Sequence, residues 1–110
     1  MINLIKPEPK FRNGYKDKKR LSDIHEIPCV NCFAKGRPQR NRTIAHHKIG
    51  MGIGLKASDL FTMAICESCH TGTKGIHNIP LKKWEEDNFS QDDLIELTNK
   101  LLENIQWRQQ

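Results

Sequence analysis

Two Cys-x-x-Cys pairs constrain the fold of this chain more strongly than any other feature. The first pair is Cys29 and Cys32, and the second is Cys66 and Cys69. A Cys-x-x-Cys turn places two sulfurs on one side of a metal ion, so the two turns together offer the four tetrahedral ligands of a structural zinc. The alternative is a set of buried or redox-active thiols. Two matched pairs in one small chain favour zinc.

The small size of the chain makes a stabilising metal useful. Of its 110 residues, 36% are hydrophobic and 6% aromatic, and a domain of this size buries only a thin core. No segment is apolar enough for a signal peptide or a membrane span. We therefore expect a cytoplasmic protein with no membrane partner, in a compartment that keeps thiols reduced. The net charge of +5 favours an anionic partner, most often nucleic acid.

The charge pattern divides the chain into a basic arm and one folded domain. Residues 1–21 are polar and rich in lysine and arginine, and they include Pro7 and Pro9. Such a segment predicts an extended arm that orders on a partner, although a solvated tail would have the same composition. Residues 22–110 then form the zinc-containing domain.

The apolar pattern of the domain predicts an α+β fold. Residues 43–47 and 60–66 are expected to form two strands that pair across a loop at Gly50–Gly54. Residues 80–89 are expected to form a helix with Trp84 facing inward, because proline suits a first helical turn. A capping box at Ser90 and Asp93 would begin a second helix of about four turns. The core-facing stripe of that helix would be Leu94, Ile95, Leu97, Leu101, Leu102 and Ile105.

Four of the five histidines lie close to the cysteines in the sequence. His46 and His47 are adjacent on the expected first strand, so their side chains point to opposite faces. His70 follows Cys69 directly, and His77 comes seven residues later. One member of the adjacent pair, together with His70 and His77, could hold a second metal ion. The other could deprotonate water at neutral pH, but the spacing does not say which of the two does which.

The stretch IPCVNC…AHHKIGMGIGLKASDLFTMAICESCHTGTKGIH resembles the HNH, or His-Me finger, endonucleases. It is most similar to the small phage and prophage branch that includes the recombination-enhancement (Ref-like) nucleases. The resemblance extends from about Pro7 to the C-terminal helix and is densest over residues 28–77. It implies a ββα-metal core, DNA phosphodiester hydrolysis in the cytoplasm of a bacterial host, and a recombinase filament as a further partner.

The resemblance also implies roles for individual residues. His46 and His70 match metal ligands of the family, His77 matches a further histidine of this branch, and His47 matches the general base. The ion would be Mg²⁺, Mn²⁺, Ni²⁺ or Zn²⁺, in addition to the structural zinc. The family has an asparagine before its second strand, where the nearest candidate here is Asp59. An aspartate at that place could also be a turn or helix-capping residue.

Basic residues outside the histidine cluster are candidates for binding the DNA backbone by charge, without sequence readout. They are Lys18, Lys19, Arg20, Arg37, Arg40, Arg42 and Lys56. A non-catalytic zinc module that binds nucleic acid would explain the cysteines and the charge equally well, but not the clustered histidines. A protein-interaction adaptor that uses the C-terminal helix is a weaker alternative, because the apolar stripe of that helix is more simply core.

Overall fold

The computed structural model describes residues 14–50 and 57–108. Its two strands, β1 (Thr43–His47) and β2 (Thr62–Cys66), pair antiparallel with Ala45 opposite Ala64. Both predicted strands and their pairing are therefore confirmed. The second strand begins two residues later than expected, because residues 59–61 form the 3-10 turn η2 (Asp59–Phe61). The Ser58 hydroxyl caps this turn by accepting from the Leu60 amide at 3.1 Å.

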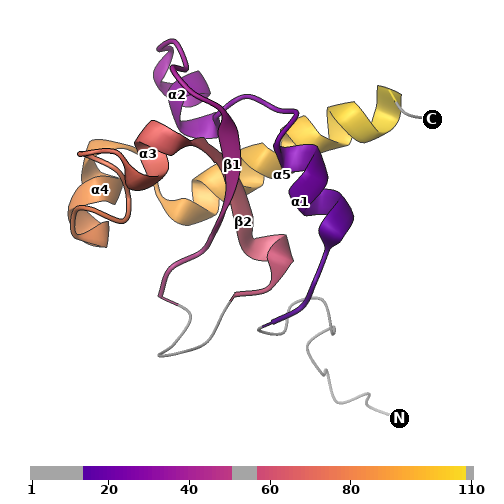
Figure 1. Cartoon of the computed structure of the whole chain (residues 1–110), viewed down its shortest axis with the longest axis horizontal. Helices are drawn as coiled ribbons and strands as arrows, with labels where there is room; N and C mark the ends of the chain where they lie inside the picture. The colour runs from indigo at the N-terminus through magenta and orange to yellow at the C-terminus, as the bar shows by residue number, and fades with distance from the viewer. Residues whose placement is uncertain (1–13, 51–56, 109–110) are drawn as a thin grey trace.

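Among the described residues, five α-helices surround the hairpin: α1 (Lys18–Ile24), α2 (Val30–Lys35), α3 (Glu67–Thr71), α4 (Leu81–Asp87) and α5 (Gln91–Arg108). Figure 1 shows α1 on one side of the hairpin, α3 and α4 on the other, and α5 running behind it. α5 contacts β2, α1 and α2. The α+β class is thus confirmed. None of the described helices is long and apolar enough to cross a membrane.

The last helix is fixed to the sheet by both apolar and polar contacts. Leu94 and Leu102 are buried, and Ser90 Oγ accepts from the Asp93 amide at 3.1 Å, as the capping pattern predicts. Thr98 is fully buried and accepts from the Ala64 amide at 3.1 Å, so an outward-facing N–H of β2 finds a partner on α5. The helix has 18 residues, about one turn more than the pattern predicts.

The expectation of an extended arm up to residue 21 is wrong for the residues that the structure describes. α1 begins at Lys18 with Asp17 as its cap. Arg20 donates to Thr62 Oγ1 at 2.8 Å, to the Thr62 carbonyl at 2.7 Å and to Asn99 Oδ1 at 2.7 Å. Ile24 is completely buried. The many charges in this segment did not predict the short helix α1, which packs on the domain. Residues 1–13 lie outside the described chain.

The core lies between the hairpin and α5. Trp84 is 1% exposed, so its expected inward orientation is confirmed. Met63, Ala64 and Ile65 are all fully buried, because α5 and the short helices cover both faces of β2. The four cysteines are also part of this core. The predicted zinc ligands therefore lie within the hydrophobic core.

Candidate functional site

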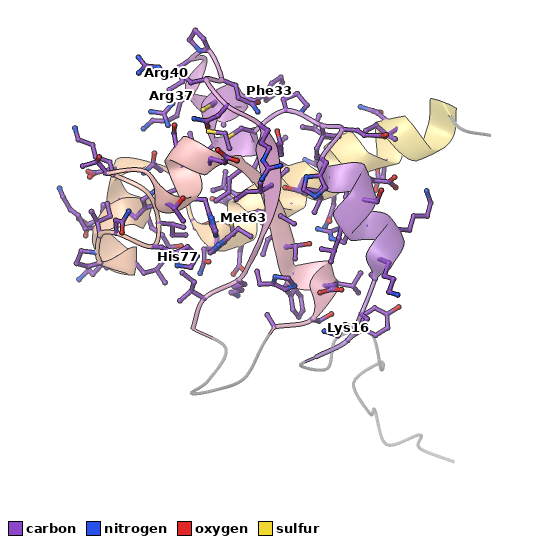
Figure 2. The ribbon with its side chains drawn as sticks, in the orientation of Figure 1. Lys16, Phe33, Arg37, Arg40, Met63 and His77 are labelled. Atoms are coloured by element: carbon purple, nitrogen blue, oxygen red, sulfur yellow. The ribbon has the colours of Figure 1, made fainter. Side chains whose placement is uncertain are left out.

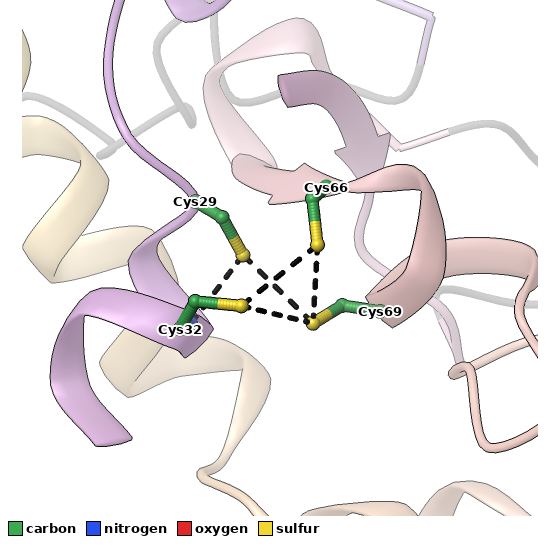
Figure 3. A group of neighbouring side chains, drawn as sticks. All are labelled: Cys29, Cys32, Cys66 and Cys69. Carbon is green, nitrogen blue, oxygen red and sulfur yellow. Dashed lines mark hydrogen bonds between the residues drawn. The ribbon is translucent and has the colours of Figure 1, made fainter. Parts of the chain in front are cut away.

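The four cysteine sulfurs converge on one point (Figure 3). Cys66 and Cys69 are 3.6 Å apart, and Cys32 lies 3.8 Å from each of them. Zinc–sulfur bonds are about 2.3 Å long, and a regular tetrahedron of that radius has edges of about 3.8 Å. All four thiols are free and buried. The residues present can therefore hold a zinc ion as the sequence indicates, with no rearrangement of the backbone.

Two chain turns bring these sulfurs together. Cys29 is the N-cap of α2, and its sulfur accepts from the Cys32 amide at 3.4 Å. Cys66 ends β2 and is the N-cap of α3. Each pair thus lies at a helix N-terminus, where free amides stabilise negative sulfur. A left-handed Gly36 (φ 69°) ends α2 and turns the chain back toward β1.

Two further side chains donate to the sulfurs. Asn31 Nδ2 lies 3.4 Å from Cys69 Sγ, and Arg37 reaches Cys69 Sγ at 3.2 Å and Cys32 Sγ at 3.4 Å. The pKa of Cys69 is lowered to about 4, chiefly by a hydrogen bond from Cys29 and also by these two donors. Zinc with four thiolates carries a charge of about −2. Arg37, which the sequence suggested as a DNA contact, donates to two of these sulfurs and would offset part of that charge.

Three histidines form a second cluster beside the cysteines. The ring centroids of His46 and His70 are 5.1 Å apart, those of His46 and His77 5.0 Å, and those of His70 and His77 4.4 Å. One ring nitrogen of each lies within 4.8 Å of the others, close enough for small ring rotations to direct all three at one ion. His46 is buried, whereas His77 is exposed, so the cluster is open to solvent on one side.

A tight turn brings His77 back to His70 despite the intervening residues. The Ile76 amide donates to the Cys69 carbonyl at 2.9 Å, and the His77 amide donates to the His70 carbonyl at 3.1 Å. A Cβ atom at Gly75 would lie 2.7 Å from the carbonyl carbon and oxygen of His70. The turn therefore requires glycine at this position. Gly75 is therefore the sequence signal for a tight turn between His70 and His77, although the sequence alone does not show why glycine is needed there.

His46 is almost completely buried. Its pKa is lowered to about 4, chiefly by burial and also by the neighbouring His70 and His77. A neutral imidazole is the form that ligates metals. Its Nε2 lies 3.4 Å from Gln91 Oε1, and the Gln91 side chain also bonds the amide and carbonyl of Ile49 at 2.9 and 3.0 Å. Sequence reasoning missed Gln91, because a glutamine in the first turn of a helix carries no pattern of its own.

His47 points away from the cluster, toward a buried carboxylate. Its Nε2 lies 2.6 Å from Asp59 Oδ1, and Asp59 is 2% exposed. The Asp17 amide donates to Asp59 Oδ2 at 2.7 Å, and the Asp59 amide donates to the Tyr15 carbonyl at 2.9 Å. The carboxylate therefore orients the His47 ring, with Nε2 toward Asp59 and Nδ1 on the opposite edge. The two adjacent histidines thus belong to different groups, as strand geometry predicts.

The other basic candidates are spread over the molecule. Lys19 pairs with Asp23 at 3.1 Å, and Arg42 pairs with Glu67 at 2.6 Å. Lys18 and Arg40 are exposed. The guanidinium of Arg20 donates to Thr62 and Asn99, so we no longer expect it to contact a phosphate. Lys56 and most of the expected glycine loop lie in residues 51–56, outside the described part of the chain.

Comparisons with protein-family models, curated proteins and solved structures find no match to this chain. The functional argument therefore depends on the geometry of the two clusters and of the His47–Asp59 pair. These are a tetrahedral set of sulfurs, an open set of three imidazoles, and a histidine oriented by a buried carboxylate.

Proposed function

We propose that this protein is a metal-dependent endonuclease that hydrolyses DNA phosphodiester bonds in the manner of the HNH enzymes. The observation that carries the proposal is that two adjacent histidines have different neighbours. His46 lies with His70 and His77, while His47 lies with Asp59. Hydrolysis of a phosphodiester needs charge stabilisation at the phosphate and a base that activates water. The two histidines supply one group for each need.

His46, His70 and His77 would hold the second metal ion. When bound, a divalent ion supplies stabilisation of the charge that develops on the phosphate and leaving oxygens. In the part of the chain that the structure describes, the donor set contains three imidazoles and no carboxylate. Imidazole suits Zn²⁺ and Ni²⁺ better than Mg²⁺, which prefers oxygen ligands. Among the four candidate ions, Zn²⁺ and Ni²⁺ therefore fit the cluster best.

His47 acts as the general base. Its Nδ1 accepts the proton of the attacking water, while Asp59 at 2.6 Å from Nε2 fixes the tautomer and stabilises the imidazolium that forms. Because Asp59 is buried and its other oxygen accepts from the Asp17 amide, the carboxylate stays in place as the charge on His47 changes. Asp59 touches no reacting atom, and we therefore describe it as a positioning residue.

The cysteine cluster organises the catalytic groups. Cys69 and His70 are neighbours on α3, and the turn that returns His77 is bonded to the carbonyls of both. A zinc ion on the four sulfurs would fix α3 relative to β2 and thereby fix two of the three imidazoles. A hairpin followed by this helix is also the order of elements that the resemblance to His-Me finger enzymes implies.

The experiment that tests the proposal is a cleavage assay with the zinc-loaded protein. Supercoiled plasmid and circular single-stranded DNA are incubated with added Ni²⁺, Zn²⁺, Mn²⁺ or Mg²⁺. We expect cleavage by the wild type and a loss of about 10²–10⁴-fold in His47→Ala, the usual contribution of a general base. His25→Ala is the matched control, because His25 is the one histidine outside both groups; it is exposed and contacts the Thr43 carbonyl.

Two results would contradict the proposal. A His47→Ala protein that cleaves at the wild-type rate would refute the assignment of His47 as the general base. A wild type that cleaves neither DNA with any of the four ions would leave the non-catalytic zinc module as the better description.

A further inference from the structure

A groove of about 900 Å³ lies beside the cysteines, and Cys32, Cys66 and Cys69 are among its lining residues. It is bordered by α2, the segment that follows α2, the turn after α3, and α4. Five cations line it: Lys35, Arg37, Arg40, Lys74 and Lys83. Of the described residues that line it, Asp87 is the only one with a carboxylate. Figure 2 shows Arg37 and Arg40 at one edge of the molecule, on the other side of α3 from His77. The groove therefore presents a net positive charge to solvent.

Three of these five cations already have partners within the protein. Lys35 donates to the Asp87 carbonyl at 3.1 Å and to Asn88 Oδ1 at 2.8 Å, and Lys83 pairs with Asp87 at 3.3 Å. Arg37 contacts the cysteine sulfurs. Within the described chain, by contrast, no hydrogen bond or ion pair joins the side chain of Arg40 or Lys74 to a neighbour, and both residues are exposed. These two charges, on separate walls, are available to an anionic ligand.

We propose that this groove binds an unpaired nucleic-acid strand, with Arg40 and Lys74 contacting its phosphates. The inference rests on the proposed function in one respect, that the ligand is nucleic acid. A single strand can lie in a groove between two cationic walls. A positively charged groove that follows the nucleic-acid backbone is a usual way in which proteins hold single strands. Pro38 and Ile79 also line the groove and offer apolar contact to sugars and bases.

The position of the groove connects it to the catalytic histidines. Cys69 lines the groove, whereas the next residue, His70, belongs to the histidine cluster. Lys74 lies in the turn that joins His70 to His77. A strand held in the groove would therefore continue past α3 to the cluster. The substrate class that follows is DNA with an unpaired strand beside the scissile phosphate, such as a flap or a fork.

The test is a binding measurement that does not depend on cleavage. Full-length zinc-loaded protein carrying His47→Ala is titrated against a fluorescent single strand, a duplex and a forked DNA, and binding is followed by anisotropy over a range of salt concentrations. Adding Arg40→Ala and Lys74→Ala should weaken single-strand and fork binding several-fold. The slope of log affinity against log salt should fall by about 1.4, for two lost contacts at about 0.7 each.

The control removes the same charge elsewhere. Lys82→Ala with Lys100→Ala changes two exposed lysines that do not line the groove, and it should leave the difference between single strand and duplex unchanged. Zinc content confirms that each variant is folded.

The proposal is overturned if the Arg40–Lys74 double variant binds the single strand with wild-type affinity and salt slope. It is also overturned if the variant loses duplex and single-strand affinity equally, because the groove would then be an ordinary contact to the DNA backbone. Since no cleavage is measured, these outcomes are distinguishable from a failure of the nuclease activity itself.

Discussion

Replacing Asp59 with asparagine removes one hydrogen-bond acceptor from a buried site without changing its size. In the native protein, one carboxylate oxygen lies 2.6 Å from His47 Nε2 and the other accepts from the Asp17 amide at 2.7 Å. An amide has a single acceptor oxygen, so only one of these bonds can survive. If the oxygen stays on the Asp17 amide, the new NH₂ group faces His47 and favours the tautomer with its proton on Nδ1, which cannot act as the base.

The expected cost has two parts. A buried hydrogen bond to a charged group contributes about 1.5–3 kcal/mol. At about 4–8 °C for each kcal/mol in a domain of this size, Asp59→Asn should lower Tm by roughly 6–24 °C. The wrong histidine tautomer should also lower kcat for cleavage by about 10²–10⁴-fold. Replacing the carboxylate that orients a catalytic histidine with an amide has effects of that order.

The assay is plasmid cleavage at saturating DNA, at a temperature well below the lowered Tm. We expect kcat to fall and KM to change little, because Asp59 is buried and does not reach the DNA. Asp92→Asn is the matched control. Asp92 is exposed and forms a surface ion pair with Lys48 at 2.7 Å, a contact worth about 0–1 kcal/mol. An Asp59→Asn protein with wild-type kcat would refute the assignment of Asp59 as the residue that orients His47.

Three other perturbations separate the roles of the remaining parts. Cys66→Ser removes one of four converging sulfurs and should abolish retention of zinc and cooperative thermal unfolding, as elemental analysis and circular dichroism would show. Gly75→Ala places a methyl group 2.7 Å from the His70 carbonyl and should weaken Ni²⁺ binding in calorimetry while the protein keeps its zinc. Deleting residues 1–13 removes three cations and one carboxylate; it should flatten the salt dependence of DNA binding and leave Tm unchanged, because α1 is retained.

The parts that could be predicted from sequence depend on local patterns. The strand at Thr43–His47, the inward Trp84, the cap at Ser90 and the convergence of the cysteines each follow from residue spacing or from chemistry within a few positions. Periodicity and ligand spacing act over such short ranges, so they can be read without knowing the tertiary structure.

The missed features depend on contacts between distant segments. Tyr15 and Asp17 bond Asp59, 42 or more residues away, although their segment had the composition of a solvated arm. Gln91 reaches across to Ile49 and His46. Charge runs and single polar residues do not reveal such partners, because a hydrogen bond between remote residues leaves no periodic trace in the sequence.

The most direct test of the central claim measures metal binding and DNA cleavage in the same samples. Zinc-loaded protein is titrated with Ni²⁺, and bound metal and plasmid nicking are recorded at each step. The account predicts that nicking rises with the occupancy of one additional site per chain, and that His70→Ala shifts both curves together to higher Ni²⁺ concentration, because that residue is one of three imidazoles in the cluster. Binding of an additional ion without nicking, or nicking that His70→Ala leaves unchanged, would contradict it.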